Sequence, residues 1–208
     1  MKKSPLWHGI PGASVLFLCL ILFPVVLQAQ QKGTFKDTRD GHVYNWVKIG
    51  TQVWMTTNMK FDIPAESWSY NNDSITDLHY GKLYTWKGAQ SACPKGWHLP
   101  SDKEWNVLIQ SLGGVTGAGA KLQAMDTVPN IIGIPAPAVP GPVSSLLGGI
   151  RHSDASCIGI NSWGGCWTSA KVNDSVATNV LFAHGSKEIG FSTNDKKSGF
   201  SVRCIRNK

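Results

Sequence analysis

The chain is short of acidic residues and of cysteine. Its 208 residues include 13 acids against 20 lysines and arginines, a formal net charge of +7, and only 5 cysteines. So few acids leave little material for the paired carboxylates of a glycosidase. The basic residues are scattered, and after residue 29 only Lys196 and Lys197 are adjacent. A nucleic-acid-binding surface needs its basic residues clustered, so we expect no nucleic-acid partner.

Long apolar runs are also scarce, because the only one lies near the N terminus. Two lysines precede an apolar run over residues 13–27, and Ala29 is a small residue at a cleavage position. This order is typical of a secretory signal peptide. An uncleaved anchor helix is the alternative, but Pro24 interrupts the run, which is short for a membrane span. We predict a signal peptide over 1–29, one domain over 30–208 and no stable membrane insertion after the signal is removed.

Four cysteines follow the signal peptide: Cys93, Cys157, Cys166 and Cys204. An even number in an exported chain points to disulfides, although the sequence alone leaves their pairing open. A zinc site with four thiolates is the alternative. Such sites use closely spaced cysteine pairs, and no pair here has that spacing. We therefore predict no metal site.

A helix is the most clearly marked element of the sequence. Ser101 and Glu104 have the spacing of a capping box, in which each side chain bonds a backbone N–H of the first turn. An apolar stripe with helical spacing follows at Trp105, Leu108, Ile109 and Leu112. Gly113 can end the helix in a left-handed conformation. The same reasoning predicts helical structure over 81–93 and 118–125.

Strands are predicted on both sides of these helices. Alternating β-branched and aromatic residues over 43–49 and 53–57 predict a hairpin, and the polar residues 62–80 predict a long surface loop. Short strands with glycine-rich turns are expected over 146–150, 164–169, 176–184, 188–192 and 200–205. The last two of these should form a closing hairpin.

Several ordered motifs of the chain resemble one family. They are Tyr84-x-Trp86, Cys93-Pro-x-Gly-Trp97-His98-Leu99-Pro100-Ser101, Gly148-Gly149-x-Arg151, Trp167-x-Ser169 and Gly199-Phe200-Ser201-Val202-Arg203-Cys204. Over about residues 34–206 the chain resembles the Fibrobacter succinogenes major paralogous domain family, which is common in exported Bacteroidota and Fibrobacterota proteins. The resemblance implies an α+β fold of the C-type-lectin-like type, with two helices packed on antiparallel strands, long loops and disulfide staples. This fold is distantly related to that of the formylglycine-generating enzymes.

The resemblance also implies how the cysteines pair. It selects Cys93–Cys204, which would join a helix to the last strand, and Cys157–Cys166, which would close a short loop. On the chain-entropy model the long bridge would stabilise the fold by about 4–5 kcal/mol and the short bridge by about 2.5–3 kcal/mol.

Two kinds of region are candidates for ligand contact. In the C-type-lectin-like fold ligands usually meet the long loop region, here the proline-rich residues 126–147; a variable loop without a ligand is the alternative. Exposed aromatic rings can stack on sugars, and Trp163, Trp68 and Trp167 lie in loop-rich sequence. The alternative is that they pack in the core, as Trp167 would because it matches a family motif. Trp163 is the best single candidate for an exposed contact.

No catalytic set can be assembled from the sequence. His98, Ser101 and Asp102 lie close together, but Ser101 is used as a helix cap and a catalytic triad is defined by geometry. The formylglycine-generating relatives use two reactive cysteines with copper, whereas each cysteine here has an implied disulfide partner. The calcium-binding motifs of sugar-binding C-type lectins are absent, and calcium needs about six to eight oxygen ligands. We predict no catalytic residue and no cofactor.

The sequence therefore predicts a non-catalytic, exported binding or adhesion module of the cell envelope or extracellular space. Its loops would contact a glycan or a surface protein, and it would lie in the periplasm, on the cell surface or in the medium. Two alternatives stay open. An enzyme of the formylglycine-generating or glycosidase type needs a free thiol or a cleft with two close acids, and a purely structural surface protein needs neither.

Overall fold

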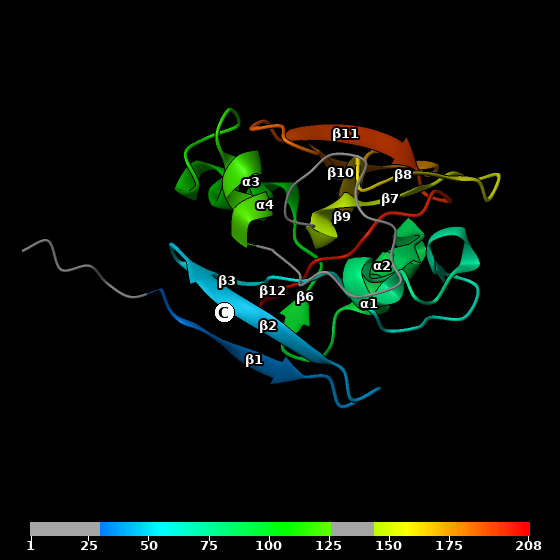
Figure 1. Cartoon of the computed structure of the whole chain (residues 1–208), viewed down its shortest axis with the longest axis horizontal. Helices are drawn as coiled ribbons and strands as arrows, with labels where there is room; N and C mark the ends of the chain where they lie inside the picture. Colours follow the sequence, from blue (N-terminus) through cyan, green and yellow to red (C-terminus); the bar gives the residue numbers. More distant parts are fainter. Residues whose placement is uncertain (1–29, 126–143) are drawn as a thin grey trace, which may run out of the picture.

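The computed structural model describes residues 30–125 and 144–208. The predicted signal peptide and most of the proline-rich loop lie outside these ranges. The described chain is a mixed α+β structure with two five-stranded sheets, which lie in separate layers (Figure 1). None of its helices is both long and apolar enough to cross a membrane.

The first sheet joins the three N-terminal strands to β12 and β6, in the order β1-β2-β3-β12-β6. The bounds are Lys32–Lys36 for β1, Val43–Ile49 for β2, Gln52–Met55 for β3, Ile205–Arg206 for β12 and Trp97–His98 for β6. All its neighbours are antiparallel. The predicted hairpin over 43–49 and 53–57 is confirmed as β2 and β3, although β3 already ends at Met55.

The second sheet has the order β11-β10-β9-β7-β8. The bounds are Gly190–Asp195 for β11, Val176–Ala183 for β10, Trp163–Lys171 for β9, Gly148–Arg151 for β7 and Cys157–Ile160 for β8. Its strands are antiparallel except for β7 and β9, which are parallel and meet at Gly149 and Gly164. A Cβ atom on Gly164 would lie 1.6 Å from the carbonyl oxygen of Leu146. The close approach of β9 to Leu146, just before β7, therefore requires glycine at this position.

The helices lie at the two ends of the layered structure (Figure 1). They are α1 (Asp77–Tyr80), α2 (Trp86–Ala92), α3 (Asp102–Ser111) and α4 (Ala118–Met125), with 3-10 turns at Tyr70–Asn72 and Ser145–Leu147. A two-stranded sheet pairs β4 (Ser67–Trp68) with β5 (Leu83–Tyr84). The predicted loop over 62–80 is thus partly wrong, because it contains β4, a 3-10 turn and α1.

Helix α3 forms as its capping residues predict. The Ser101 hydroxyl accepts from the Glu104 backbone N–H at 3.3 Å, and the Glu104 carboxylate accepts from the Ser101 N–H at 2.8 Å. The predicted apolar stripe is buried in the core. Gly113 follows the helix with a φ of 101°, so a left-handed residue ends it as expected.

The predicted helix over 81–93 begins later than expected. Leu83 and Tyr84 are drawn into β5 by pairing with β4. Thr85 then caps α2, because its hydroxyl accepts from the backbone N–H of Gly88 at 3.0 Å. Tertiary strand pairing thus overrides the helical pattern of the first residues.

The predicted closing hairpin is wrong. Strand β11 pairs with β10 and lies at the edge of the second sheet. Residues 198–205, which we call the closing segment, leave that edge, are all buried and run between the two layers (Figure 1). On one side Gly199 exchanges two backbone hydrogen bonds with Arg151 of β7. On the other, the carbonyl of Cys204 accepts from the N–H of Met55 in β3 at 3.0 Å.

The disulfide Cys93–Cys204 is present, with an S–S distance of 2.05 Å. The prediction of a second disulfide, Cys157–Cys166, is wrong, because these two residues are not bonded to each other. Cys157 lies opposite Arg151 of β7. The closing segment lies between Arg151 and Cys166. Its Gly199 forms a β-bridge with Arg151, and its Ser201 forms one with Cys166. At least two strand spacings of about 4.8 Å each therefore separate the cysteines. This exceeds the separation of about 7 Å between Cα atoms that a disulfide can span.

Replacing Cys204 with alanine should lower the free energy of unfolding by about 4–5 kcal/mol, because the bridge closes a loop of long sequence separation. Equilibrium unfolding in denaturant measures this change. The matched control is Cys157→Ala, which removes a half-buried side chain outside the bridge and should have a much smaller effect. Peptide mapping without reduction should join the peptides of Cys93 and Cys204. A peptide pair that joins Cys157 to Cys166 would contradict the strand order.

Candidate functional site

Trp163 is the only exposed tryptophan among residues 30–125 and 144–208. Its side chain is 55% exposed, and it lies at the start of β9, after the turn from β8. Gly159 of β8 lies beneath it, since a Cβ atom there would be 2.9 Å from Cβ and 3.2 Å from Cγ of Trp163. The side chain therefore contacts the backbone of β8, the preceding strand of the chain.

The turn that carries Trp163 is anchored on both sides. Asn161 has a φ of 65°, and its N–H donates to the carbonyl of Leu147 at 2.9 Å. Its side-chain oxygen accepts from the hydroxyl of Tyr80. The N–H of His184, just after β10, donates to the carbonyl of Ser162 at 2.9 Å. These bonds fix the direction of the exposed ring.

The other two predicted tryptophans have different environments. Trp68 in β4 is half-buried, and the guanidinium carbon of Arg151 lies 4.0 Å from its ring centroid, so this cation covers part of the ring. Trp167 is fully buried. Its Nε1 donates to the carbonyl of Tyr84 at 2.7 Å, and its ring packs edge-on against Phe200 with centroids 4.7 Å apart. Trp167 is therefore a core residue, and the prediction that it contacts a ligand is wrong.

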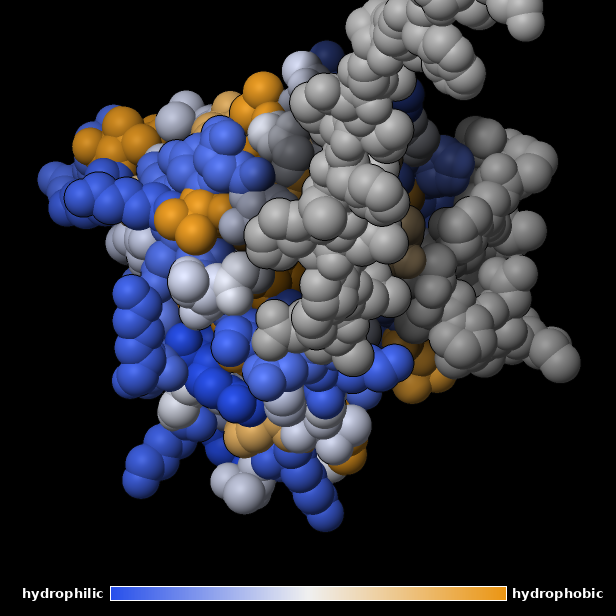
Figure 2. All heavy atoms as spheres, turned by 90° about the vertical axis from the view of Figure 1, so that its left-hand side faces the viewer, coloured by the Kyte–Doolittle hydropathy of each residue, from blue (hydrophilic) through white to orange (hydrophobic). Residues whose placement is uncertain are grey.

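Other exposed large apolar side chains come from several elements of the described chain. Figure 2 shows the side of the molecule that is on the left in Figure 1, and the coloured part of this face is mostly hydrophilic with small, separated hydrophobic spots. Ile158, which precedes Gly159, is 50% exposed. The Trp163 turn thus has an apolar neighbour in β8. On the coloured part of the face in Figure 2, recognition would depend on polar groups.

His98, Ser101 and Asp102 do not form a catalytic triad. The carboxylate of Glu104 accepts from the Ser101 hydroxyl at 2.9 Å and is 2.8 Å from His98 Nε2. His98 Nδ1 is 2.6 Å from the side-chain oxygen of Asn207. The Ser101 hydroxyl thus donates to Glu104 and not to the imidazole of His98, which would have to activate it as a nucleophile. Ser101 serves the helix cap instead.

The cysteines of the second sheet are too far apart to act as a pair. The sequence argument against a reactive pair of cysteines was that each cysteine has a disulfide partner. It does not hold for Cys157 and Cys166, which form no disulfide with each other. The strand order nevertheless separates them by at least two strand spacings, whereas two thiolates that bind one metal ion share a single coordination sphere. Within the described ranges, no group of three or more His, Cys, Asp and Glu residues could hold a metal ion.

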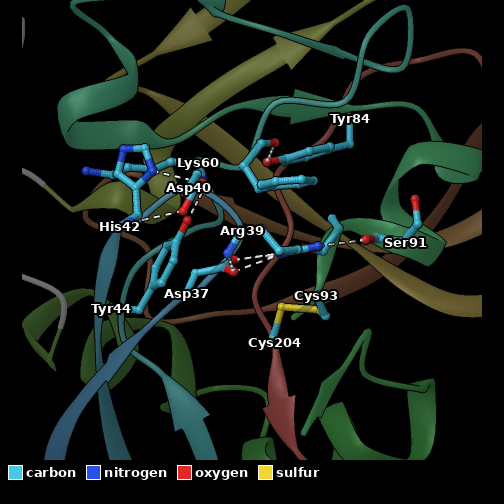
Figure 3. Close-up of polar contacts among 12 residues, drawn as sticks. Asp37, Arg39, Asp40, His42, Tyr44, Lys60, Tyr84, Ser91, Cys93 and Cys204 are labelled. Carbon is cyan, nitrogen blue, oxygen red and sulfur yellow. Dashed lines mark hydrogen bonds and ion pairs between the residues drawn. A yellow bond between two sulfur atoms is a disulfide. The ribbon is translucent and has the colours of Figure 1, made fainter. Parts of the chain in front are cut away.

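A cluster of polar contacts surrounds Arg39, and no sequence motif pointed to it (Figure 3). Arg39 donates to both oxygens of the buried Asp37, at 3.0 and 2.7 Å. It also donates to the carbonyls of Ser91 and Ala92 at 3.3 and 2.7 Å, the last carbonyls of α2. A cation there favours the helix C terminus. The cluster therefore fastens the β1–β2 loop to α2, beside the Cys93–Cys204 disulfide, and its role is structural.

The fold and these surfaces define a disulfide-bonded α+β domain that displays one tryptophan on an anchored turn. Residues 47–206 match the family model described as Fibrobacter succinogenes major domain. The match covers most of the chain, so the chain belongs to this family. Comparisons with curated proteins and with solved structures gave no match. The family description names no activity, and the function has to be argued from the geometry.

Replacing Asp37 with asparagine should lower the free energy of unfolding at neutral pH by about 1–3 kcal/mol, because Arg39 would lose its carboxylate acceptor. Burial alone would raise the pKa of Asp37, but hydrogen bonds from the side chain and backbone of Arg39 outweigh it and hold the pKa below its usual value. The unfolded pKa is about 3.9. The carboxylate therefore stabilises the fold above that pH, and this stabilisation is lost as the pH falls through the lower folded-state pKa.

The stability gap between this variant and the natural protein should accordingly shrink below pH about 4, as measured by denaturant unfolding at a series of pH values. Asp174→Asn is the control, because the Asp174 side chain is 96% exposed and pairs with Lys171; it should change stability little. A gap that stays constant across the acid range would show that the charge of Asp37 does not act through Arg39.

Proposed function

We propose that this chain is a non-catalytic, exported binding module that presents Trp163 to a glycan or a surface protein. The observation that carries the proposal is the exposed indole on an anchored turn. Leaving a large aromatic side chain in water forgoes about 1.5–3 kcal/mol of burial energy, so its exposure on a fixed turn favours a binding role. A ring that is already held in place loses little side-chain freedom when it binds.

The chemistry of the turn suits a sugar ring. The indole offers an apolar face that can stack on the C–H face of a pyranose, and its Nε1–H can donate a hydrogen bond. The side chain of Ser162 beside it is exposed and polar. Ile158 in β8 adds apolar surface next to the turn. An apolar platform with polar neighbours is the usual composition of a small-ligand contact surface.

The arrangement of the helices and the disulfide supports a C-type-lectin-like fold. Helices α2 and α3 follow one another in the chain. Cys93, directly after α2, is bonded to Cys204, directly before the last strand. This bridge is the one that the family resemblance implies. The four helices and the parallel pair of β7 and β9 go beyond the two helices and antiparallel strands expected from the sequence.

Export is supported by the disulfide and by the pattern of the first 29 residues. Disulfides form and persist in oxidising compartments, and the apolar run after two lysines has the order of a signal peptide. The module would then meet its partner in the periplasm, at the cell surface or outside the cell.

Replacing Trp163 with alanine should weaken binding to the recognised glycan by about tenfold or more, as expected when a central aromatic contact is removed. A glycan array probed with the mature protein would first identify the ligand, and titration calorimetry would then compare the variants. The Trp163→Ala variant should unfold at nearly the same denaturant concentration as the natural protein because the ring is largely exposed. The matched control is Val172→Ala, which removes another exposed apolar side chain, 55% exposed, and should bind normally.

Two results would overturn the proposal. One is that every glycan or protein ligand found binds Trp163→Ala as tightly as the natural protein. The other is turnover of a substrate by the mature protein, which would favour the alternative of an enzyme. If the array finds no glycan, a pull-down with surface proteins of the producing cell would test the protein partner, with the same two variants as probe and control.

A further inference from the structure

A cleft lies between the first sheet and the N-terminal turn of α3. Its volume is about 430 Å³, and its walls come from β2, β3, β12 and α3, with Gln31 at one edge. This volume falls within the range of small-molecule binding sites. The cleft is separate from the Trp163 turn, which belongs to the second sheet.

Positive charge gathers in this cleft. Four basic side chains line it: Lys48, Lys103, Arg206 and Lys208. None of them has an ion pair with any other residue in the described parts of the chain. Lysines elsewhere, such as Lys82 and Lys87, do have acidic partners. Like charges that gather without counter-charges attract an anion.

Arg206 is the best oriented of these cations. Its guanidinium carbon lies 4.7 Å from the ring centroid of Trp46 and 5.0 Å from that of Trp97. Trp46 is itself fixed, because its Nε1 donates to the carbonyl of Thr34 at 3.2 Å. Ile205, the preceding residue, is buried in the core. The rings hold the guanidinium in place, and its planar set of N–H donors matches the two oxygens of a carboxylate.

The single acidic side chain in the lining does not cancel this charge. Glu104 directs one oxygen to His98 and the other to the N–H and hydroxyl of Ser101. Burial alone would raise its pKa, but the hydrogen bonds from Ser101 and His98 outweigh burial and lower it. The carboxylate is therefore ionised and offsets one of the four positive charges, but the cations remain in excess and its oxygens are occupied by His98 and by the helix cap.

Neutral groups in the lining suit a ligand rich in hydroxyl groups. Gln31 and Thr51 are exposed and bring amide and hydroxyl groups to the cleft. Val53 and Val107 add apolar surface to the same lining, and the Val107 side chain is 45% exposed. Sugars combine hydroxyl groups with apolar C–H faces, so this mixture fits them.

We propose that the cleft binds an oligosaccharide that carries carboxylate groups. Arg206 would bind one carboxylate through two parallel N–H donors, and Lys48 and Lys103 would attract the neighbouring ones. The site does not depend on Trp163, so it can be present or absent whatever the outcome for the proposed function. Nucleic acid fits less well, because the one aromatic ring in the lining, Trp46, is already engaged by Arg206 and bases need free rings on which to stack.

The test is titration calorimetry of the mature protein with a short oligogalacturonide. Binding is expected, and it should weaken with added sodium chloride because the attraction is between charges. The same oligosaccharide with its carboxylates methyl-esterified should bind at least about tenfold more weakly. Inorganic phosphate and a short single-stranded oligonucleotide are run in parallel, and both should bind more weakly than the oligogalacturonide.

Variants locate the site. Arg206→Gln should lower the affinity at least about tenfold, the size expected for a charge-assisted pair, and Lys103→Gln about two- to fivefold. Lys197→Gln is the matched control, because it removes one positive charge outside the cleft and should leave binding unchanged. Trp163→Ala should also leave it unchanged. Failure of the Trp163 experiment with intact oligogalacturonide binding would overturn the proposed function alone.

Several results would overturn the inference. They are absence of binding, equal binding of the methyl ester, an equal loss of affinity in Lys197→Gln and Arg206→Gln, or tighter binding of phosphate or of the oligonucleotide. Because Arg206 is exposed, its replacement should not unfold the protein. Circular dichroism of each variant checks this, and Lys103→Gln gives an independent reading on α3 if Arg206→Gln is destabilised.

Discussion

Backbone hydrogen bonding by the closing segment links the two layers of this fold. A buried N–H or C=O group without a partner costs about 1–3 kcal/mol, so a segment that runs between two sheets is stable only if both neighbours supply partners. Phe200 exchanges hydrogen bonds with Tyr84 of β5, and Ser201 bonds with Gly165 and Trp167 of β9. Farther along, the carbonyl of Val202 accepts from Met59 at 2.8 Å. The disulfide at Cys204 then fixes the end of the segment to α2, so the position of each sheet depends on the same few residues.

The elements that the sequence predicted well are those that depend on local interactions. Helix α3 has its cap and its apolar stripe within a dozen or so residues, and the hairpin of β2 and β3 has its partners on either side of a short turn. The prediction of a closing hairpin was wrong because the hydrogen-bond partners of residues 198–205 lie far away in the sequence, at positions such as Met55 and Arg151. Periodicity gives no information about such pairings. The prediction of the disulfide Cys157–Cys166 was wrong for the same reason, since the segments that lie between these two cysteines in the sheet include one from a distant part of the chain.

The candidate surfaces differ in how far a sequence can reveal them. Exposure of Trp163 follows from its position in a turn of Asn and Gly residues, which is a local signal. Burial of Trp167, which lies four residues farther along β9, depends on Tyr84 and Phe200 and has no local signal. The basic cleft is the extreme case. Lys48, Lys103 and Arg206 come from three separate stretches, and the sequence shows them only as scattered charges, from which we expected no nucleic-acid partner.

Both surfaces are nevertheless positioned by the closing segment. Strand β9, which begins with Trp163, bonds to Ser201, and Arg206 directly follows the buried Ile205, which pairs with Trp54 and His98. The side chains that would contact a ligand are exposed and make few internal bonds, so they can change without disturbing the core. The closing segment cannot change so freely, because its neighbours on both sides are fixed by hydrogen bonds and by the disulfide. The fold can therefore stay the same while the residues of the Trp163 turn and of the cleft vary.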